Sequence, residues 1–232
     1  PAALVEVGSG IHRDPNVRAT EVEIHDGLEA HAQNAWPSLQ FDVGEVNDLL
    51  WRFFPAGFYY KTFMGGPRGW MTWEPMIRRA AGMGRAPDGP DPDRYEQVNA
   101  HCDVLVVGGG PAGLMAALAA ARSGARVILC EETAGLGGRL LSQDPGQVLL
   151  GGKRATDWVA ELAHELRERD DVTVLTRTSA FGYYAENFVG LWERVSDHLP
   201  RGERLANLPR QRVWRVRAKR VVLATGAIER PL

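Results

Sequence analysis

The chain has 232 residues, enough for one large domain or one and a half small ones. Its 27 Lys and Arg nearly balance its 29 Asp and Glu, and the resulting net charge of −2 gives no support for a nucleic-acid or anionic-membrane partner. With no signal peptide and no long apolar run, we expect a soluble, cytoplasmic protein without a membrane partner.

Both cysteines, Cys102 and Cys130, adjoin predicted buried strands. We expect them to be small core residues rather than a disulfide or a metal pair. The sequence starts at Pro1 without Met and ends at Leu232 directly after a predicted strand and turn. We therefore expect it to be a segment of a longer chain.

The first part of the chain alternates short β-like runs with turns. Strands are predicted at Ala3–Val7 and Thr20–Ile24, on either side of the turn-rich stretch Gly8–Asn16. A helix is predicted at Val43–Phe53, because apolar residues recur there at spacings of three and four.

An aromatic-rich segment follows at Phe54–Met83, with a short helix predicted at Glu74–Ala81. The segment is too rich in Gly and Pro to be regular and too apolar to be a solvated loop. Two interpretations stay open: irregular chain packed on its own domain, or a surface buried by another subunit or by a missing part of the chain, because interfaces are enriched in aromatic residues, Met and Arg. Arg85–Asp93 is predicted to be a linker.

The stretch Asp103–Glu132 carries the clearest motif. A buried strand is predicted at Val104–Val107, followed by the turn Gly108–Gly113, which fits G-x-G-x-x-G. A helix at Leu114–Ser123 and a second strand at Arg126–Cys130 come next. Strand, turn, helix, strand and a following acid are the context that this motif has in dinucleotide-binding domains.

Each residue of the motif has a physical role. Gly108 permits the tight turn, Gly110 lets backbone approach a pyrophosphate, and Gly113 lets the helix pack close against the strand. The unpaired N–H groups and positive dipole of the helix N-terminus favour a diphosphate. Glu131 is placed to accept hydrogen bonds from the adenosine ribose, and its charge argues against the 2′-phosphate of NADP.

Further elements of the same domain follow. Gly137–Gly138 is predicted to be a turn beside the adenosine end of the site, and Arg139 either meets a phosphate or is an ordinary surface arginine. An amphipathic helix is predicted at Thr156–Arg169 and a third strand at Val172–Leu175. Thr178–Ala180 would then lie near the ligand crevice of an open parallel sheet.

The last part of the chain reads as a small antiparallel meander inserted after the third parallel strand. It consists of a hairpin at Gly182–Val195, with Ala185–Asn187 as its turn, and a strand at Gln211–Arg217. Another buried strand is predicted at Val221–Thr225, and the Thr225–Gly226 turn would let backbone approach a ligand.

The predicted fold class is α/β: a partial, doubly wound Rossmann-type parallel sheet with a β-meander insert, preceded by a remnant of a ferredoxin-like α+β domain. Residues 1–40 are assigned to the remnant and residues 41–101 to an irregular, aromatic-rich connector and linker. Residues 102–232 are assigned to the first half of a dinucleotide-binding domain for FAD or NAD. The predicted order of the parallel strands is third, second, first, then the strand that starts at Val221.

These motifs together resemble a known family, the two-dinucleotide-binding-domain flavoproteins of the glutathione-reductase type. The residues that carry the resemblance are the glycine turn with Glu131, the Gly137–Gly138 turn, the meander and Ala224–Ala227. Within that family the chain is most similar to the α subunits of heterotetrameric sarcosine oxidases. The similarity covers essentially the whole chain, and it is carried by the blocks PAALVEVGSG, NVRATEVEIHDGLEAHAQNAWPSL, FPAGFYYKTFM and ATGAIERPL.

The resemblance implies an oxidoreductase that works as part of a multi-subunit complex. The implied reaction oxidises sarcosine to glycine with O2, giving hydrogen peroxide and, with tetrahydrofolate, methylenetetrahydrofolate. It implies tightly bound NAD in the Rossmann site of this chain, FAD in the β subunit and FMN at the α–β junction. The implied partners are the β, γ and δ subunits, and we expect the present segment alone to be inactive.

The resemblance also implies which residues bind the cofactor. The glycine turn would contact the diphosphate, Glu131 to Thr133 the ribose or adenine, Arg139 a phosphate or the ribose, and Ala180 the adenine. The complete set is Gly108, Gly110, Pro111, Ala112, Gly113, Glu131, Glu132, Thr133, Gly138, Arg139, Ala180, Thr225 and Gly226. No catalytic residue and no metal ligand is predicted, because the histidines are scattered without metal-ligand spacing.

Two alternatives stay open. One is the FAD-binding subunit of an opine oxidase or hydrogen cyanide synthase-like amine dehydrogenase, because FAD and NAD present the same adenosine diphosphate to the motif. The other is a non-catalytic assembly subunit in which the dinucleotide is structural, which the aromatic-rich segment motivates.

Overall fold

The structure, a computed structural model, describes residues 4–33, 35, 37–46, 67–143, 148–204 and 207–227. The chain forms two compact units. The first unit comprises Pro1–Asp93 and His198–Glu203, and the second comprises Arg94–Asp197 and Arg204–Leu232. Each unit is described by itself below.

The first unit contains a 3-stranded antiparallel sheet in the order β2-β1-β3. Strand β1 (Leu4–Val7) confirms the first predicted strand. The prediction at Thr20–Ile24 is wrong, because a 3-10 turn covers Ala19–Glu21 and Val22–Ile24 form no strand. Strand β2 (Asp14–Arg18) instead lies largely within the stretch predicted as turns, and β3 covers Ala30–Ala32. Pairing with β1 decides which segment becomes a strand, and local β propensity is overridden.

Helix α3 (Pro67–Ala80) belongs to the same unit and begins earlier than the helix predicted at Glu74–Ala81. Its Met71 and Met76 are exposed. Of the helix predicted at Val43–Phe53, the structure describes a 3-10 turn at Val43–Glu45 followed by Val46, and residues 47–53 lie outside the described residues. Residues 54–66 of the aromatic-rich segment also lie outside the described residues, and the two interpretations of that segment stay as predictions.

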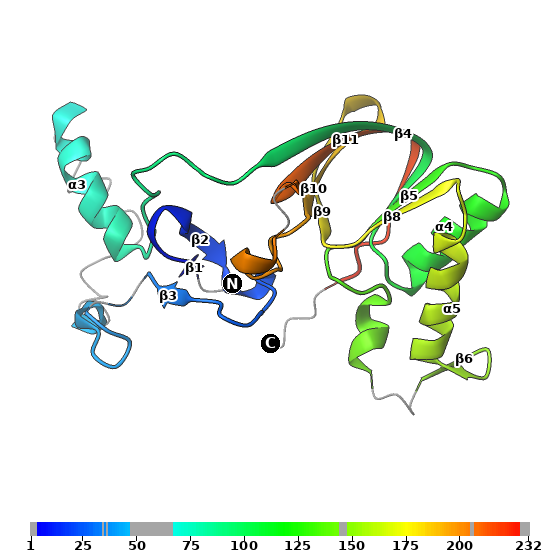
Figure 1. Cartoon of the computed structure of the whole chain (residues 1–232), viewed down its shortest axis with the longest axis horizontal. Coiled ribbons are helices and arrows are strands. Elements are labelled where there is room, and N and C mark those ends of the chain that lie inside the picture. The colour runs from blue at the N-terminus through cyan, green and yellow to red at the C-terminus, as the bar shows by residue number, and fades with distance from the viewer. Residues whose placement is uncertain are drawn as a thin grey trace. The chain divides into compact units, whose positions relative to one another are not determined.

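The second unit is built on a 6-stranded sheet in the order β8-β5-β4-β11-β10-β9 (Figure 1). The first four strands are parallel neighbours, and β10 and β9 join antiparallel. This arrangement confirms the predicted order of the parallel strands and the meander beside them. The strands are β8 (Val172–Leu175), β5 (Val127–Cys130), β4 (Tyr95–Val107), β11 (Gln211–Leu223), β10 (Phe188–Arg194) and β9 (Thr178–Tyr184).

Strands β4 and β11 are longer than predicted. They run side by side from the pair Tyr95 and Gln211 to the pair Val107 and Leu223. The two strands predicted at Gln211–Arg217 and Val221–Thr225 are therefore one strand, because no Gly or Pro interrupts it and the pairing with β4 continues through the middle. The start of β4 also places sheet residues inside the range 41–101 that the sequence assigns to a connector.

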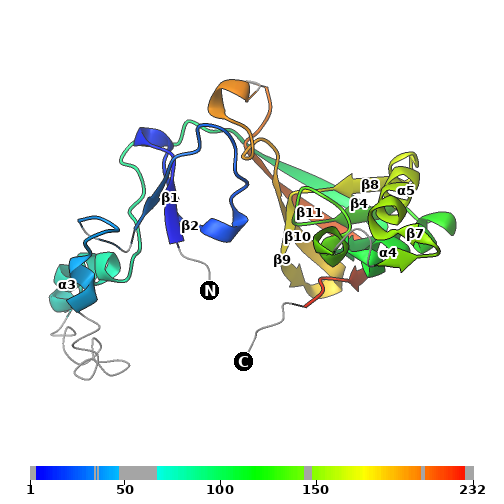
Figure 2. The ribbon, with the colours of Figure 1, turned by 90° about the horizontal axis from the view of Figure 1, so that it is seen from below.

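Two helices cover one face of the parallel strands. Helix α4 (Pro111–Arg122) begins at Pro111, before the predicted start at Leu114, since proline is favoured in the first turn of a helix. Helix α5 (Ala155–Arg167) follows the prediction closely. Figures 1 and 2 both show these helices near β5 and β8, away from the hairpin of β9 and β10.

A hydrophobic core lies on each face of the sheet. The helix-side core is formed by residues such as Val106, Leu114, Leu118, Leu129, Leu162 and Leu166. The opposite core joins the parallel strands to the meander through Leu105, Ile128, Leu175, Val189, Leu191 and Val216. Each fully buried Leu contributes roughly 1.5–3 kcal/mol of transfer free energy, so the two cores fix the meander and both helices on the same sheet.

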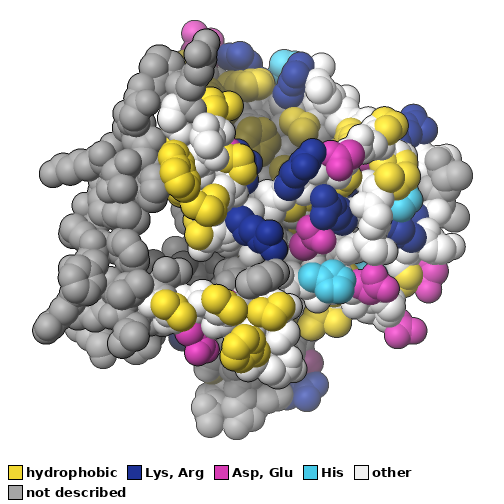
Figure 3. All heavy atoms as spheres, turned by 90° about the vertical axis from the view of Figure 1, so that its left-hand side faces the viewer, with side chains coloured by type: hydrophobic (Ala, Val, Ile, Leu, Met, Phe, Trp, Pro, Cys, Tyr) yellow, Lys and Arg dark blue, Asp and Glu magenta, His cyan; other side chains and the backbone are white. Residues whose placement is uncertain are grey.

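The hairpin turn is confirmed at Ala185–Asn187, between β9 and β10. Two further short strands, β6 (Leu149–Leu150) and β7 (Lys153–Arg154), form a small ladder before α5. On the face drawn in Figure 3, acidic and basic side chains are interspersed, as the balanced composition predicts. Across the described residues, no helix combines the length and apolar character needed to cross a membrane.

Candidate functional site

The turn between β4 and α4 depends on glycine at two positions. Gly108 has φ +106°, and a Cβ there would lie 2.3 Å from the carbonyl oxygen of Ala224. A Cβ on Gly113 would lie 1.8 Å from the carbonyl oxygen of Gly108. Both contacts are with backbone that cannot move aside, so the sharp turn and the close packing of α4 require glycine.

Gly110 differs from its neighbours in the turn. A Cβ built on Gly110 would meet no heavy atom within 4 Å. The position faces open space at the N-terminus of α4, where Ala112 and Gly113 carry N–H groups without intrahelical acceptors. Such a space beside unpaired N–H groups is a cradle for an anionic group that approaches the backbone closely.

The second glycine pair, Gly137–Gly138, packs against this turn. The N–H of Gly137 donates to the carbonyl of Gly109 at 2.8 Å. A Cβ on Gly138 would lie 3.1 Å from the Cα of Gly110, and Gly138 has φ +53°. Arg139 follows in a 3-10 turn at Gly138–Ser142, so it comes directly after the glycine that approaches Gly110.

Glu131 lies directly behind the glycine turn, at the end of β5, and is only 8% exposed. Its Oε2 accepts the N–H of Gly109 at 2.7 Å, and its Oε1 accepts the N–H and the hydroxyl of Thr133, each at 2.9 Å. Gly109, which the sequence analysis did not single out, thus helps to hold the carboxylate of Glu131. The sequence carries a signal for this residue, because position 109 is a glycine although the motif accepts any residue there. In the structure, a Cβ on Gly109 would lie 2.6 Å from the side chain of Leu136.

The end of β11 completes this edge of the sheet. The N–H of Ala224 donates to the carbonyl of Val107 at 2.8 Å, which places the Thr225–Gly226 turn next to Gly108. The carboxyl ends of β4, β5 and β11 thus meet, which is where ligands bind in open α/β sheets. The structure brings together the glycine turn, Glu131, Thr133, Gly138 and Thr225.

Glu132 and Ala180 lie farther along this edge. Both side chains are exposed. Ala180 belongs to β9, whose first residue, Thr178, donates its N–H to the carbonyl of Glu131 at 2.8 Å. The chain segment that carries Ala180 is therefore anchored beside the acid, and the contact of Ala180 with adenine stays a prediction.

The two cysteines are core residues, as predicted, and are free thiols. Cys102 is 2% exposed and Cys130 is 1% exposed. Desolvation by burial raises the pKa of Cys102 to about 11 and that of Cys130 to about 12. Both thiols therefore stay protonated at neutral pH, which makes them poor nucleophiles.

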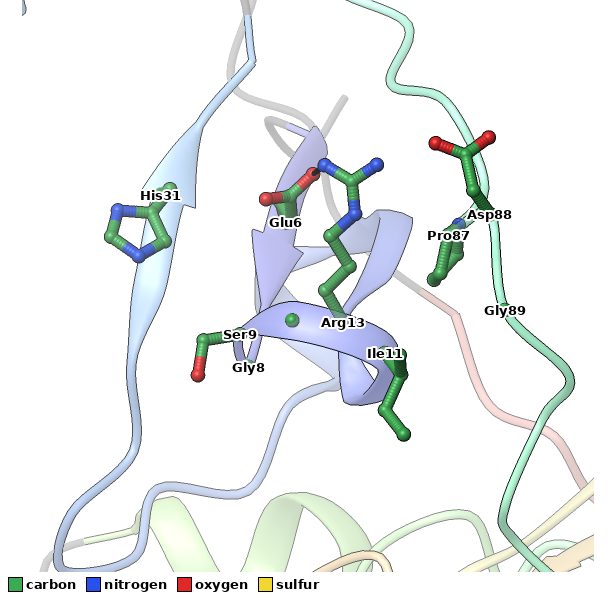
Figure 4. A pocket seen from close by; sticks show the side chains of 10 residues that line it. Glu6, Gly8, Ser9, Ile11, Arg13, His31, Pro87, Asp88 and Gly89 are labelled. Carbon is green, nitrogen blue, oxygen red and sulfur yellow. Dashed lines mark hydrogen bonds and ion pairs between the residues drawn. The ribbon is translucent and has the colours of Figure 1, made fainter.

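Among the residues that the structure describes, no group of three or more His, Cys, Asp and Glu is placed to hold a metal ion. The first unit has a hollow lined by Glu6, Arg13, His31 and Asp88 among others (Figure 4). There Arg13 pairs with Glu6 at 3.2 Å, so the two charges neutralise each other. None of the predicted cofactor residues lines this hollow, and the candidate site is the edge of the second unit.

Comparison with protein families matches residues 103–225 to the family described as FAD dependent oxidoreductase. The chain belongs to the FAD-dependent oxidoreductase family. The matched residues run from Asp103, within β4, to the Thr225 turn, and so include residues of all six strands of the sheet. This family indicates a flavin-binding domain, and it names FAD where the sequence resemblance implied NAD.

Two relatives of this FAD-dependent oxidoreductase carry the same name, sarcosine oxidase subunit alpha. The protein from Rhizobium meliloti (strain 1021) is 52% identical over 233 residues, which is 100% of this chain and 23% of the relative. The protein from Corynebacterium sp. (strain P-1) is 44% identical over 151 residues, 65% of this chain and 15% of the relative. The resemblance seen in the sequence is thereby confirmed, and the chain spans less than a quarter of the length of these relatives.

Among solved structures, L-proline dehydrogenase from P. horikoshii is 26% identical, with a TM-score of 0.44. The match covers 65% of this chain and 29% of that protein.

Proposed function

We propose that this chain is the dinucleotide-binding part of an amine-oxidising enzyme of the sarcosine oxidase type. The reaction would convert sarcosine to glycine with O2, giving hydrogen peroxide and, with tetrahydrofolate, methylenetetrahydrofolate. The observation that carries the proposal is the 52% identity with a sarcosine oxidase α subunit over the whole chain. The site geometry supports it, since the edge of the second unit has the features that an adenosine dinucleotide needs.

The diphosphate would lie at the N-terminus of α4. The backbone N–H groups of Ala112 and Gly113 would donate to it, and the open space at Gly110 would admit it close to the main chain. Pro111 leaves no N–H unsatisfied at the first helical position. Arg139 is the proposed phosphate or ribose cation, and Gly226, with φ +71°, lets the chain turn on the other side.

The adenosine ribose would bind to Glu131. A carboxylate has about four acceptor positions, and the hydrogen bonds from Gly109 and Thr133 fill three of those on Glu131. Oε2 of Glu131 accepts one hydrogen bond, from Gly109, and has one acceptor position left for a ribose hydroxyl. The Thr133 hydroxyl also lies 2.9 Å from the carbonyl of Gly135, so it can turn to that acceptor and release Oε1 for a second hydroxyl.

Glu131 and Glu132 would repel a 2′-phosphate, which disfavours NADP. We propose that Glu132 and Thr133 flank the ribose and that Ala180 lies beside the adenine. No residue of this chain is proposed to be catalytic. When bound, the flavins of the assembled enzyme supply the redox chemistry, and the residues of this chain hold and orient the dinucleotide.

The proposed dinucleotide in this site is NAD, with FAD and FMN elsewhere in the complex and with β, γ and δ subunits as partners. The resemblance to the sarcosine oxidase α subunits supports this assignment. The second candidate is FAD in the same site, as in an opine oxidase or hydrogen cyanide synthase-like dehydrogenase, and the match to the FAD-dependent oxidoreductase family favours it. Both dinucleotides present adenosine diphosphate to the residues described above.

The test uses the protein purified at its natural length with the subunits that accompany it. After denaturation, the released NAD, FAD and FMN are separated and counted per complex, and O2 consumption with sarcosine is measured. NAD with both flavins and turnover of sarcosine support the proposal. FAD as the only dinucleotide moves the assignment to the second candidate, and the absence of any adenine dinucleotide contradicts both.

A further inference from the structure

One peptide group orients the carboxylate of Glu131. The peptide between Glu132 and Thr133 donates its N–H to Glu131 Oε1 at 2.9 Å. The carbonyl of the same peptide accepts a hydrogen bond from Arg194 Nη2 at 2.6 Å. Because a peptide group is planar, holding its C=O also sets the direction of its N–H. Arg194 is thus connected to the carboxylate through a single rigid group.

The positive charge of the Arg194 guanidinium also strengthens the hydrogen bond from Thr133 to Glu131. A cation at a carbonyl oxygen polarises the peptide, and hydrogen bonds that share a group strengthen one another. The N–H of Thr133 therefore becomes a better donor to Glu131. The N–H of Thr133 thus holds Oε1 of Glu131, and the N–H of Gly109 holds Oε2 at 2.7 Å.

The neighbouring carbonyls of this loop are also held by the meander. The carbonyl of Glu131 accepts the N–H of Thr178 at 2.8 Å, and the carbonyl of Thr133 accepts the N–H of Arg177 at 2.9 Å. Those two contacts are made by backbone at the start of β9, whereas the contact with Glu132 is made by a side chain from the end of β10. Of these three contacts, the one from Arg194 is made by a side chain, so a substitution at Arg194 can remove it without changing the main chain.

We propose that Arg194 is a positioning residue for the dinucleotide: it holds the peptide between Glu132 and Thr133 so that Glu131 presents its carboxylate to the ribose hydroxyls. The inference rests on the proposed function, since it takes Glu131 as the ribose acceptor. It also gives the meander a role in ligand binding, because β10 carries the guanidinium and β9 anchors the rest of the loop.

The experiment measures binding of ADP by calorimetry to the natural-length protein, with its accompanying subunits, after bound dinucleotide has been removed. We expect Arg194→Gln to weaken ADP binding about three- to tenfold, less than the direct loss of a charge-assisted hydrogen bond, because Arg194 acts through one intermediate peptide group. Arg194→Lys keeps a cationic donor and should recover part of the affinity. Arg215→Gln is the matched control, because Arg215 is an exposed arginine on the neighbouring strand β11, and it should bind ADP as the wild type does.

A double-mutant cycle distinguishes a positioning role from a merely structural one. It combines Arg194→Gln with Glu131→Gln, and the affinity of each protein is measured for ADP and for 2′-deoxy-ADP. If Arg194 acts through the carboxylate, the effect of Arg194→Gln disappears in the Glu131→Gln background and shrinks for 2′-deoxy-ADP. An equal loss in every background and for both ligands would mean that Arg194 only supports the fold, which overturns the inference. So would wild-type affinity in Arg194→Gln.

Failure of the proposed function gives a different result. A wild-type protein that does not bind ADP contradicts the assignment of the site itself, and the inference about Arg194 fails with it. If Arg194→Gln does not fold, the same cycle is run with Arg194→Lys. Full additivity of Arg194→Lys with Glu131→Gln then overturns the inference.

Discussion

At the scale of single residues, Gly110 and Gly113 lie in the same turn but differ in whether the fold leaves room for a side chain. Gly113 is required by packing, because its missing Cβ would collide with the carbonyl of Gly108. Gly110 has an ordinary φ of −71° and open space around it, so the fold alone does not need glycine there. The absence of a side chain at Gly110 is explained by the ligand that we propose.

This contrast predicts two different phenotypes. Gly113→Ala should lower the free energy of unfolding by about 3 kcal/mol, although alanine is the better helix former by about 1 kcal/mol. Gly110→Ala should stay within about 0.5 kcal/mol of the wild type and lose its bound dinucleotide. Urea denaturation and the dinucleotide content after purification check both variants. Equal destabilisation by the two substitutions would contradict the proposed role of Gly110.

The buried thiols predict a pH dependence of stability. Cys102 and Cys130 have folded-state pKa values of about 11 and about 12, above the reference value of 9.0. Their contribution to stability is full below pH 9 and is lost as pH rises through the folded pKa values, because the unfolded state releases its protons first. Each thiol should remove roughly 1.4 kcal/mol per pH unit above pH 9.

The measurement is urea denaturation between pH 8 and pH 10.5 for the wild type and for Cys130→Ala. The variant should show a shallower loss of stability with pH, because one of the two titrating thiols is gone. Parallel pH profiles would show that Cys130 does not titrate differently in the folded and unfolded states. Neither thiol of the native protein should react with a disulfide reagent at pH 8.

At the scale of elements, the hairpin of β9 and β10 depends on its turn. Glu186 and Asn187 have φ values of 56° and 54°, the left-handed conformation that tight hairpin turns need. The side chain of Asn187 also accepts the hydroxyl of Tyr183 at 2.6 Å and donates to the carbonyl of Lys219 at 3.0 Å. The turn is thereby tied both to β9 and to β11.

Asn187→Ala is expected to destabilise the second unit by about 1–2 kcal/mol, because alanine is strained in the left-handed region. Asn187→Gly loses the same hydrogen bonds but accepts the backbone conformation, so it should cost less. Thermal unfolding of the two variants compares them directly. If glycine is the more harmful substitution, the side-chain contacts matter more than the backbone conformation.

On the whole-molecule scale, the two compact units should respond differently to ligand. All the residues proposed to bind the dinucleotide belong to the second unit. ADP at 100 times its dissociation constant should raise the free energy of unfolding of that unit by about 2.7 kcal/mol. Hydrogen exchange should slow in β4, β5, α4 and β11, whereas β1, β2 and β3 should exchange as before. Equal protection of both units would contradict a site confined to the second.

Much of the second unit could be predicted from sequence because its signals are local. Periodic apolar residues, the glycine turn and the acid after β5 each act within a short stretch, and they place α4, β5, α5, β8 and the end of β4 correctly. The first unit was predicted less well. Its strand β2 exists because β1 offers a pairing partner, whereas the β-branched run Thr20–Ile24 has no strand to pair with among the described residues.

The βαβ unit, with a glycine turn at the N-terminus of a helix and an acid at the end of the second strand, follows from the sequence, since each feature depends on neighbours along the chain. The way in which that acid is held depends on the three-dimensional fold. Gly109 reaches the acid from the turn after β4, and Arg194 reaches its loop from β10. Strands β4 and β11 become continuous because they pair along their length. Contacts between segments far apart in sequence leave no periodic pattern in either segment, and the fold alone brings them together.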